Sequence, residues 1–267
     1  MDKELEQEFL TFAGDIIVRA GEIASGYFRR PIPVHSKDGA AGFDPVTAAD
    51  REIEAFLREE IIAAYPDHAI LGEEQADRAG SSGYRWVIDP IDGTRSFISG
   101  SPLWGILLGL MQGDSCLLGL MHQPYLHETF GGSSAGAFLQ RGAERQPITT
   151  RATRELGDAT LYCTHPSMFS RQEDFLRFTQ VAEACRMMRY GGDCYAYCLL
   201  AGGHVDLVIE HLGGPYDIVP LIPIITAAGG VVSDWHGGPA TAGARVLAAA
   251  NADLHEQALS ILNVESE

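Results

Sequence analysis

A short apolar run that ends in two rigidly spaced carboxylates constrains the fold of this chain more than any other feature. The stretch 86–97 begins with tryptophan, valine and isoleucine, which predicts a buried strand, and then turns into a helix start. Asp89 and Asp92 stand at that junction. Pro90 fixes one backbone angle between them, and Gly93 permits a sharp bend. A stiff loop at the end of a buried element therefore presents both side chains.

Two interpretations of this loop are open from its own residues. Hard divalent cations take oxygen ligands, and two carboxylates and a carbonyl on a rigid loop supply them. Thr94 can open the following helix, where free amides would suit a phosphate group. The alternative is an ordinary Asp turn with a helix cap. Acids elsewhere in the chain have to decide between the two.

The charge balance restricts the partners of the chain. Its 267 residues include 36 acids and 19 bases, which gives a formal net charge of −17. Nucleic acids and anionic membranes bind basic surfaces, so neither is expected as a partner. An acidic enzyme can still take an anionic substrate where a bound metal reverses the local field. With 46% hydrophobic residues, the chain can form one large core or two fused lobes.

Cysteine usage and the lack of long apolar runs indicate a compartment. Five cysteines, an odd number, favour reduced thiols and a cytoplasmic location. Cys194 and Cys198 lie four apart in an apolar helical pattern, which favours core packing over zinc binding. We expect no signal peptide in the acidic N-terminal segment, and no stretch approaches the ~20 apolar residues of a membrane span.

The first half of the chain predicts two helices followed by strands. Apolar residues at helical spacing predict a long helix over Leu5–Tyr27. The glycine-containing segment Lys37–Phe43 predicts a mobile loop, and the sequence does not show whether it closes over a site. A second helix is predicted after Asp50, with Ile53, Phe56, Leu57 and Ile61 on one face. Thr47 and Asp50 have the form of a capping box at its start, which is the structural interpretation of Asp50. Strands are predicted at Ala69–Leu71, Leu103–Met111, Ser115–Met121, Glu128–Gly132 and Gly136–Leu139, the last four as an antiparallel meander.

The second half alternates strands and helices after a connection at 147–156. Strands are predicted at Thr160–Cys163, Arg186–Arg189, Val205–Ile209, Val231–Ser233 and Val246–Ala249. Helices are predicted at Arg171–Cys185, Cys194–Ala201, Tyr216–Ala228 and Leu254–Leu262, with a kink at Pro223. Helices before, between and after two sheet-forming regions predict an α/β protein of α+β type, built as a layered sandwich. We expect one unit over 1–267, with lobes at about 1–146 and 157–267.

Four separated motifs resemble those of one enzyme family. They are Asp50, the Glu-Glu pair at 73–74, the Asp-Pro-Ile-Asp-Gly-Thr run at 89–94, and Tyr216-Asp217 followed after 11 residues by Gly229-Gly230. This series is similar to the inositol monophosphatase superfamily of magnesium-dependent, lithium-sensitive phosphatases. The family has tryptophan where this chain has Tyr216, a conservative exchange that leaves the adjacent acid in place. The resemblance spans nearly the whole chain and implies the family's αβαβα sandwich.

The resemblance implies a set of metal ligands. Glu73, Asp89 and the carbonyl of Ile91 would hold one Mg²⁺. Asp89, Asp92 and Asp217 would hold a second, with Asp89 bridging the two. A third, weaker Mg²⁺ is expected near Glu73.

The resemblance also implies the catalytic groups. Thr94 and Asp50 would polarise the attacking water, and Glu73 would be both a metal ligand and a third catalytic residue. The amides of Gly93 and Thr94 would bind phosphate oxygens. Two-metal hydrolysis of this kind requires no covalent nucleophile on the protein.

Two stretches, 95–100 and 191–197, together with the pair Gln123-Pro124 after the meander, are most similar to the histidinol-phosphate phosphatase branch of the family. Asp193 and Glu210 would then line the leaving-group pocket. Histidinol phosphate carries an ammonium and an imidazole, which an acidic pair would complement. The structural alternative is that Asp193 caps the helix beginning near Cys194.

Three functions remain open at this point. The first is hydrolysis of histidinol phosphate to histidinol and phosphate in histidine biosynthesis. The second is hydrolysis of inositol monophosphate or another small sugar or nucleotide phosphate, since inositol phosphatases also carry acids in this pocket. The third is a non-catalytic metal-binding regulatory protein. The resemblance further implies a homodimer and a small phosphorylated metabolite as partner.

Overall fold

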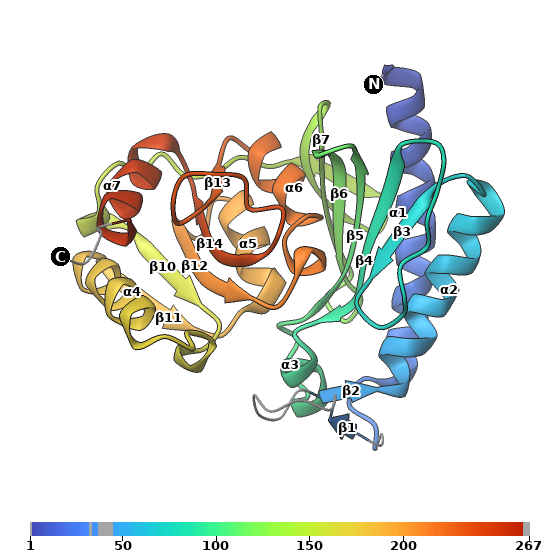
Figure 1. Ribbon diagram of the computed structural model, residues 1–267, viewed down its shortest axis with the longest axis horizontal. Coiled ribbons are helices and arrows are strands. Elements are labelled where there is room, and N and C mark those ends of the chain that lie inside the picture. Colours follow the sequence, from blue (N-terminus) through green and yellow to red (C-terminus); the bar gives the residue numbers. More distant parts are fainter. Residues whose placement is uncertain (1, 32–33, 37–44, 264–267) are drawn as a thin grey trace.

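Two β-sheets, each flanked by helices, determine the architecture of the chain. The computed structural model describes residues 2–31, 34–36 and 45–263, and the predicted loop Lys37–Phe43 lies outside the described residues. In Figure 1 helices and sheets alternate as layers along the long axis, from α1 and α2 on one side to α4 and α7 on the other. This arrangement confirms the predicted αβαβα sandwich.

The larger sheet has seven strands that follow one another in chain order. Its first pair is parallel and the following pairs are antiparallel, which confirms the predicted meander. The strands are β3 (Ala69–Gly72), β4 (Tyr84–Asp92), β5 (Gly105–Gln112), β6 (Ser115–Gln123), β7 (Glu128–Ser133), β8 (Gly136–Arg141) and β9 (Glu144–Pro147). Strand β9 was not predicted, because its residues are all exposed and show no apolar alternation.

The smaller sheet has five strands in the order β11-β10-β12-β14-β13. β10 runs parallel to both of its neighbours, and β14 runs antiparallel to both of its own. The strands are β10 (Thr160–Cys163), β11 (Met187–Tyr190), β12 (Leu207–Leu212), β13 (Val231–Asp234) and β14 (Ala244–Ala249). The division of the chain into lobes at 1–146 and 157–267 stays a prediction.

Helices occupy the layers outside and between the sheets, and one further short helix lies beyond the end of β4 (Figure 1). They are α1 (Lys3–Tyr27), α2 (Ala48–Ala64), α3 (Thr94–Ser99), α4 (Gln172–Ala184), α5 (Asp193–Ala201), α6 (Leu221–Ala227) and α7 (Ala252–Leu262). Short 3-10 turns lie at η1 (Leu156–Asp158), η2 (Pro166–Met168) and η3 (Pro215–Asp217), and β1 (Val34–Ser36) pairs with β2 (Pro45–Thr47). Within the described ranges, every helix is too short or too polar to cross a lipid bilayer.

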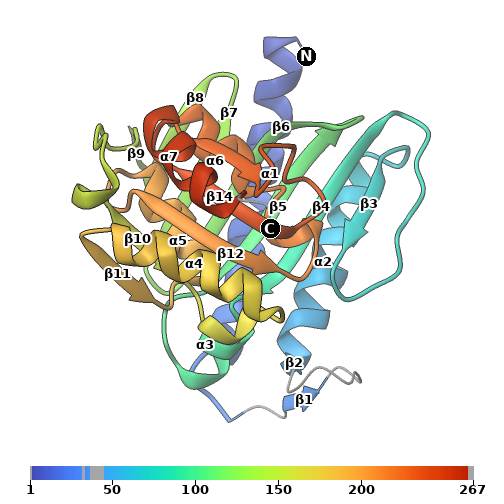
Figure 2. The ribbon, with the colours of Figure 1, turned by 60° about the vertical axis from the view of Figure 1, so that its left-hand side comes forward.

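Alternate residues of one strand serve different cores, which explains the long apolar runs of the sequence. On β5, Ile106 and Leu108 pack in the core beneath α1 and α2, whereas Leu107 packs in the core around α5 and α6. A third core, which includes Phe178 and Leu247, lies under α4 and α7. Figure 2 shows both of these helices in front of the smaller sheet. The α5–α6 layer is therefore shared between the two sheets.

The predicted helix over Tyr216–Ala228 is wrong in its bounds. The segment divides into η3 and α6, because Pro220 occupies the N-cap position of α6. Pro223 was predicted to kink a long helix, but it lies in the first turn of α6, where its missing amide hydrogen has no partner to lose. The earlier part of the segment is thereby free to form the separate turn that ends at Asp217.

Two glycines allow α6 to pack directly against the larger sheet. A Cβ atom on Gly119 would lie 1.8 Å from the carbonyl oxygen of Pro220, and one on Gly132 would lie 2.3 Å from that of Pro223. Both neighbours are backbone atoms, which cannot rotate away. The start of α6 is thus fixed on β6 and β7 by the absence of side chains.

We expect Gly119→Ala to lower the free energy of unfolding by about 1–3 kcal/mol, as overpacking of a close contact does. Chemical denaturation of the purified protein measures the change. The matched control is Gly14→Ala in the interior of α1, where a Cβ meets no atom within 4 Å; that change should stabilise by up to about 1 kcal/mol. Wild-type stability of Gly119→Ala would contradict the close approach of α6.

Candidate active site

A β-bulge turns both acids of the Asp-Pro-Ile-Asp sequence toward the same side of β4. Asp89 pairs with Leu107 and Asp92 with Gly105, so β4 takes three steps where β5 takes two. Residues three apart on a regular strand would point to opposite faces. The extra residue corrects the phase, and Pro90 suits an irregular position because it has no amide to donate to the ladder.

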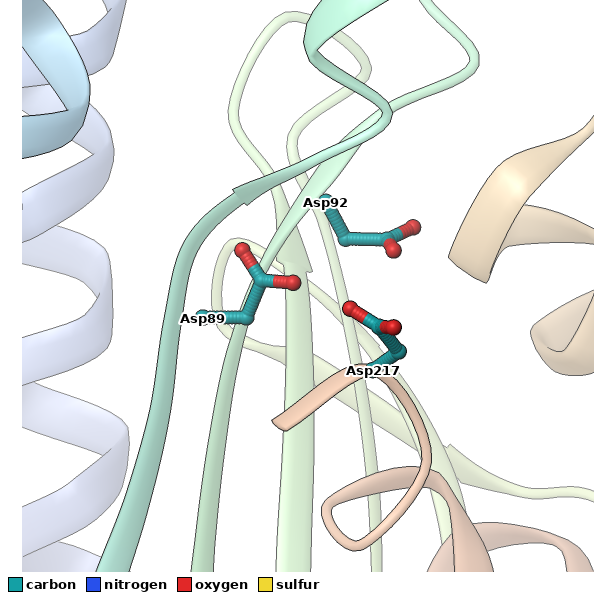
Figure 3. Close-up of side chains that lie close together, drawn as sticks. All are labelled: Asp89, Asp92 and Asp217. Atoms are coloured by element: carbon teal, nitrogen blue, oxygen red, sulfur yellow. The ribbon is translucent and has the colours of Figure 1, made fainter. Parts of the chain in front are cut away.

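A third acid from the other half of the chain joins these two. Oxygen atoms of Asp89, Asp92 and Asp217 all lie within 4.8 Å of one another. Figure 3 shows the three carboxylates turned toward a common point, with Asp217 on a separate segment from the strand that bears the other two. The turn at Asp217 is fixed locally, since its Oδ2 accepts the amides of Gly213 at 2.8 Å and Gly214 at 3.0 Å.

Burial and mutual repulsion both act on this cluster. Asp89 is 1% exposed, and burial, followed by the charges of Glu73, Asp92 and Asp217, raises its pKa well above the usual range. Burial likewise raises the pKa of Asp92, with the charges of Asp193 and Asp217 adding to it. Like charges in a site of low dielectric are held together at a cost in free energy. Oxygen donors gathered in this way fit a hard divalent cation such as Mg²⁺, whose charge offsets that cost.

The junction between the halves of the chain lies within the site. Asp92 Oδ2 accepts the backbone amide of Cys194, in the first turn of α5, at 2.5 Å. A Cβ on Gly93 would lie 3.0 Å from both Cβ and Cγ of Asp193, and Gly93 has a φ of +86°, so the position requires glycine. The loop after β4 and the start of α5 are therefore in direct contact.

The remaining predicted metal and catalytic groups of the first half lie around this loop. The charge of Glu73, just after β3, is near enough to raise the pKa of Asp89. The carbonyl of Ile91 accepts a hydrogen bond from the hydroxyl of Thr94 at 3.1 Å. Thr94 also begins α3, with Gly93 as its N-cap.

The predicted capping box at the start of α2 is confirmed. The amide of Thr47 donates to Asp50 Oδ2 at 2.9 Å, and its hydroxyl donates to the same atom at 2.5 Å. Asp50 is 1% exposed, and burial raises its pKa. Its other oxygen, Oδ1, is buried without a hydrogen-bond partner among the described residues. The cap thus leaves one oxygen of Asp50 available for a further role.

Asp193 does not cap α5 with its side chain. Gly192 is the N-cap residue, and Asp193 follows it with a φ of +45°. Its carboxylate accepts the hydroxyl of Ser96, in α3, at 2.8 Å, and its amide donates to the hydroxyl of Thr164 at 3.0 Å. Burial raises the pKa of Asp193 to about 6, and the hydrogen bond from Ser96 opposes the shift.

Glu210 lies on β12 and is 1% exposed. Its Oε1 accepts the amide of Thr164 at 2.7 Å, and its Oε2 accepts the hydroxyl of Tyr197 at 3.0 Å. Burial, partly opposed by the hydrogen bond from Thr164, raises its pKa to about 7, and the charge of Asp193 adds to the shift. The two predicted pocket acids are thus near enough to interact, with Glu210 the more deeply buried.

The acids are recognisable from the sequence, but the groups that orient them are not. Ser96 and Thr164 hold Asp193 and Glu210 from 97 and 46 residues away. Ser96 donates its hydroxyl, which is a common group, and Thr164 donates its backbone amide, so the residue type identifies neither partner. Only the fold brings these pairs together.

Comparison with known proteins agrees with this geometry. Residues 5–266 match the model of the inositol monophosphatase family. The chain is 38% identical to the bifunctional phosphatase IMPL2 of Arabidopsis thaliana, over 98% of this chain and 76% of that protein. It is 33% identical to a histidinol-phosphatase of Chlorobaculum parvum, over 85% of this chain and 86% of that one.

The fold of this chain also matches that of a solved structure. An inositol monophosphatase from Zymomonas mobilis superposes with a TM-score of 0.84 at 33% identity, and the match covers 97% of this chain and 98% of that one. Together with the acid cluster, these matches exclude the non-catalytic interpretation. The chain belongs to the inositol monophosphatase family and is a metal-dependent phosphatase.

Proposed function

We propose that this phosphatase hydrolyses histidinol phosphate in an Mg²⁺-dependent reaction. The observation that supports hydrolysis most directly is the gathering of Asp89, Asp92 and Asp217 at one point. The observation that supports this substrate is a separate acidic pair, Asp193 and Glu210, which lies next to that cluster. A cationic leaving group would meet complementary negative charge there, whereas the hydroxyl groups of inositol would use the same carboxylates only as hydrogen-bond acceptors.

In this proposal Glu73, Asp89, Ile91, Asp92 and Asp217 hold two Mg²⁺ ions, with a third, weaker ion near Glu73. Bound Mg²⁺ would activate a water molecule and neutralise charge on the phosphoryl group. The protein's own part is to place oxygen ligands from both halves of the chain around one point. The cluster offers carboxylate oxygens within 4.8 Å of one another, and burial together with the neighbouring charges raises the pKa of Asp89; both features suit that role.

Water and phosphate would be positioned by the loop after β4. The Thr94 hydroxyl, together with the free oxygen of Asp50, would polarise the attacking water, with Glu73 beside it. The amides of Gly93 and Thr94 would donate to the phosphate oxygens. The bond from Thr94 to the Ile91 carbonyl holds this hydroxyl next to the proposed ligands.

The leaving group would meet Asp193 first. Asp193 is partly exposed, whereas Glu210 is buried behind Thr164 and Tyr197. We therefore assign direct contact with the cationic end of the substrate to Asp193. Glu210 would add negative charge behind it and keep the pocket in shape.

Inositol monophosphate is the second candidate substrate. The Zymomonas mobilis protein with the same fold is an inositol monophosphatase, and its match covers nearly all of this chain. We further propose a cytoplasmic homodimer; the odd number of cysteines, all of them free thiols, supports the compartment.

A phosphate-release screen with Mg²⁺ over histidinol phosphate, inositol monophosphate, fructose bisphosphate and phosphoadenosine phosphate tests the substrate. Preference for any ester other than histidinol phosphate would refute the substrate assignment.

Asp92→Asn should remove more than nine-tenths of kcat while the fold survives, which corresponds to a rise of more than ~1.4 kcal/mol in the activation barrier. The amide keeps the size of the side chain and can still accept the Cys194 amide, but it loses the charge that a metal requires. Steady-state kinetics at saturating Mg²⁺ and circular dichroism measure the two effects. Asp174→Asn is the control, because Asp174 is also a buried acid but lies on α4, where it pairs with Arg245. This replacement should leave kcat unchanged. If Asp92→Asn keeps more than about a tenth of kcat, the role of Asp92 is wrong.

Thr94→Ala should lower kcat more than it changes KM, because the hydroxyl would act on the attacking water and not on the bound ester. Thr94→Ser, which keeps the hydroxyl, should recover most of kcat. Initial rates over a range of substrate concentrations separate the two parameters. A rise in KM alone would show that Thr94 binds substrate and that its pairing with Asp50 is mistaken.

Asp193→Asn and Glu210→Gln should reduce discrimination between histidinol phosphate and an uncharged ester such as inositol monophosphate. One charged hydrogen bond is worth roughly 1.5–3 kcal/mol, or about ten- to a hundredfold in kcat/KM. The loss should fall on the cationic substrate, because the metal ligands are unchanged. The measurement is kcat/KM of each variant on both esters. Parallel losses on both would mean that these acids support the site without reading the leaving group.

A further inference from the structure

A wholly buried carboxylate holds the loop that carries Glu73. Glu54 lies on α2 and is 0% exposed. Its Oε2 accepts the amide of Glu74 at 2.7 Å, and its Oε1 accepts the amide of Gln75 at 3.1 Å. Two consecutive backbone amides, directly after Glu73, are thus tied to one side chain of another element.

A buried arginine completes this arrangement. Arg58, 7% exposed and one turn further along α2, donates through Nε to Glu54 Oε1 at 2.7 Å. Its second amino group donates to the carbonyl of Gln75 at 3.1 Å. The ion pair therefore binds the main chain of the loop through two amides and one carbonyl. A buried ion pair is by itself weak evidence for stability, because desolvation offsets the attraction. Its bonds to the loop point to a positional role.

Gly72, the residue before Glu73, lies in close contact with the same ion pair. A Cβ on Gly72 would lie 2.2 Å from Glu54 Oε1 and 2.8 Å from an amino nitrogen of Arg58. Gly72 thus allows the end of β3 to lie directly on the carboxylate. Glu73 is held on both sides, by close contact at Gly72 and by hydrogen bonds at Glu74 and Gln75.

We infer that Glu54 is a positioning residue for the metal site: it fixes the main chain of Glu73 so that the Glu73 carboxylate faces Asp89. This inference rests on the proposed role of Glu73 as a metal ligand. Asp50 and Glu54 lie one turn apart on α2. One helix would then serve the site twice, with Asp50 toward the water and Glu54 beneath the loop.

Calorimetric titration with Mg²⁺, without substrate, tests the inference. Glu54→Gln should weaken Mg²⁺ binding about tenfold, since groups that support metal ligands typically contribute 10- to 100-fold. Gly72→Ala should do the same while it leaves every charge in place, because its Cβ displaces the Glu54 carboxylate. In both variants kcat should recover in large part at high Mg²⁺ concentration.

Asp206→Asn is the matched control. Asp206 is also 0% exposed, accepts a backbone amide from Thr160 at 2.8 Å and pairs with Arg151 at 3.0 Å. It directly precedes β12, the strand that carries Glu210. Its replacement should lower the melting temperature without changing Mg²⁺ affinity.

Three outcomes would overturn the inference. One is wild-type Mg²⁺ affinity in a folded Glu54→Gln or Gly72→Ala variant. Another is an equal loss of affinity in Asp206→Asn, which would make the effect one of general stability. The third concerns Glu73→Gln: if it binds Mg²⁺ as the wild type does, the metal role of Glu73 fails and the inference fails with it. If Glu73→Gln weakens binding and Glu54→Gln does not, only the positioning role is wrong.

Discussion

Repulsion among three carboxylates is the constraint on which the rest of the structure depends. Asp89, Asp92 and Asp217 offer oxygens within 4.8 Å of one another, and burial strengthens their repulsion. Two of them come from one strand, through a bulge that turns both to the same side. The third comes from the turn η3, which follows β12 of the smaller sheet and lies against β4. The fold thus concentrates negative charge that a metal ion would neutralise.

This constraint reconciles an acidic protein with an anionic substrate. A chain of net charge −17 repels phosphate esters at long range. Within the site, divalent cations would reverse the sign of the field at the phosphoryl group. In the proposed function, Asp193 would then face the other end of the substrate, with Glu210 behind it. Metal and pocket would act on opposite ends of one zwitterionic molecule.

Much of the fold and of the acid set could be predicted from the sequence, because both depend on local patterns. Period-two and helical spacing located the main elements, and the capping box at Thr47 and Asp50 formed as expected. The errors have local causes as well. Strand β9 pairs through its backbone, and its side chains are exposed. The separate turn η3 ends at Asp217 and Pro220 caps the start of α6, where a continuous pattern predicted a single helix.

What the sequence could not show is long-range support. The bonds from Ser96 to Asp193 and from the Cys194 amide to Asp92 join residues 97 and 102 positions apart. Glu54 gives no signal either, since an acid on an amphipathic helix is expected to face solvent. Its burial follows from the approach of the β3 loop to α2, which no pattern in either segment encodes.

The most direct test of this account is a crystal structure of the protein grown with Mn²⁺. This ion replaces Mg²⁺ at oxygen-ligand sites and can be located by its anomalous scattering. The account predicts anomalous density between Asp89, Asp92 and Asp217, with side-chain oxygens of all three within bonding distance of the metal. Mn²⁺ bound only elsewhere on the protein, with the three carboxylates contacting no ion, would contradict it.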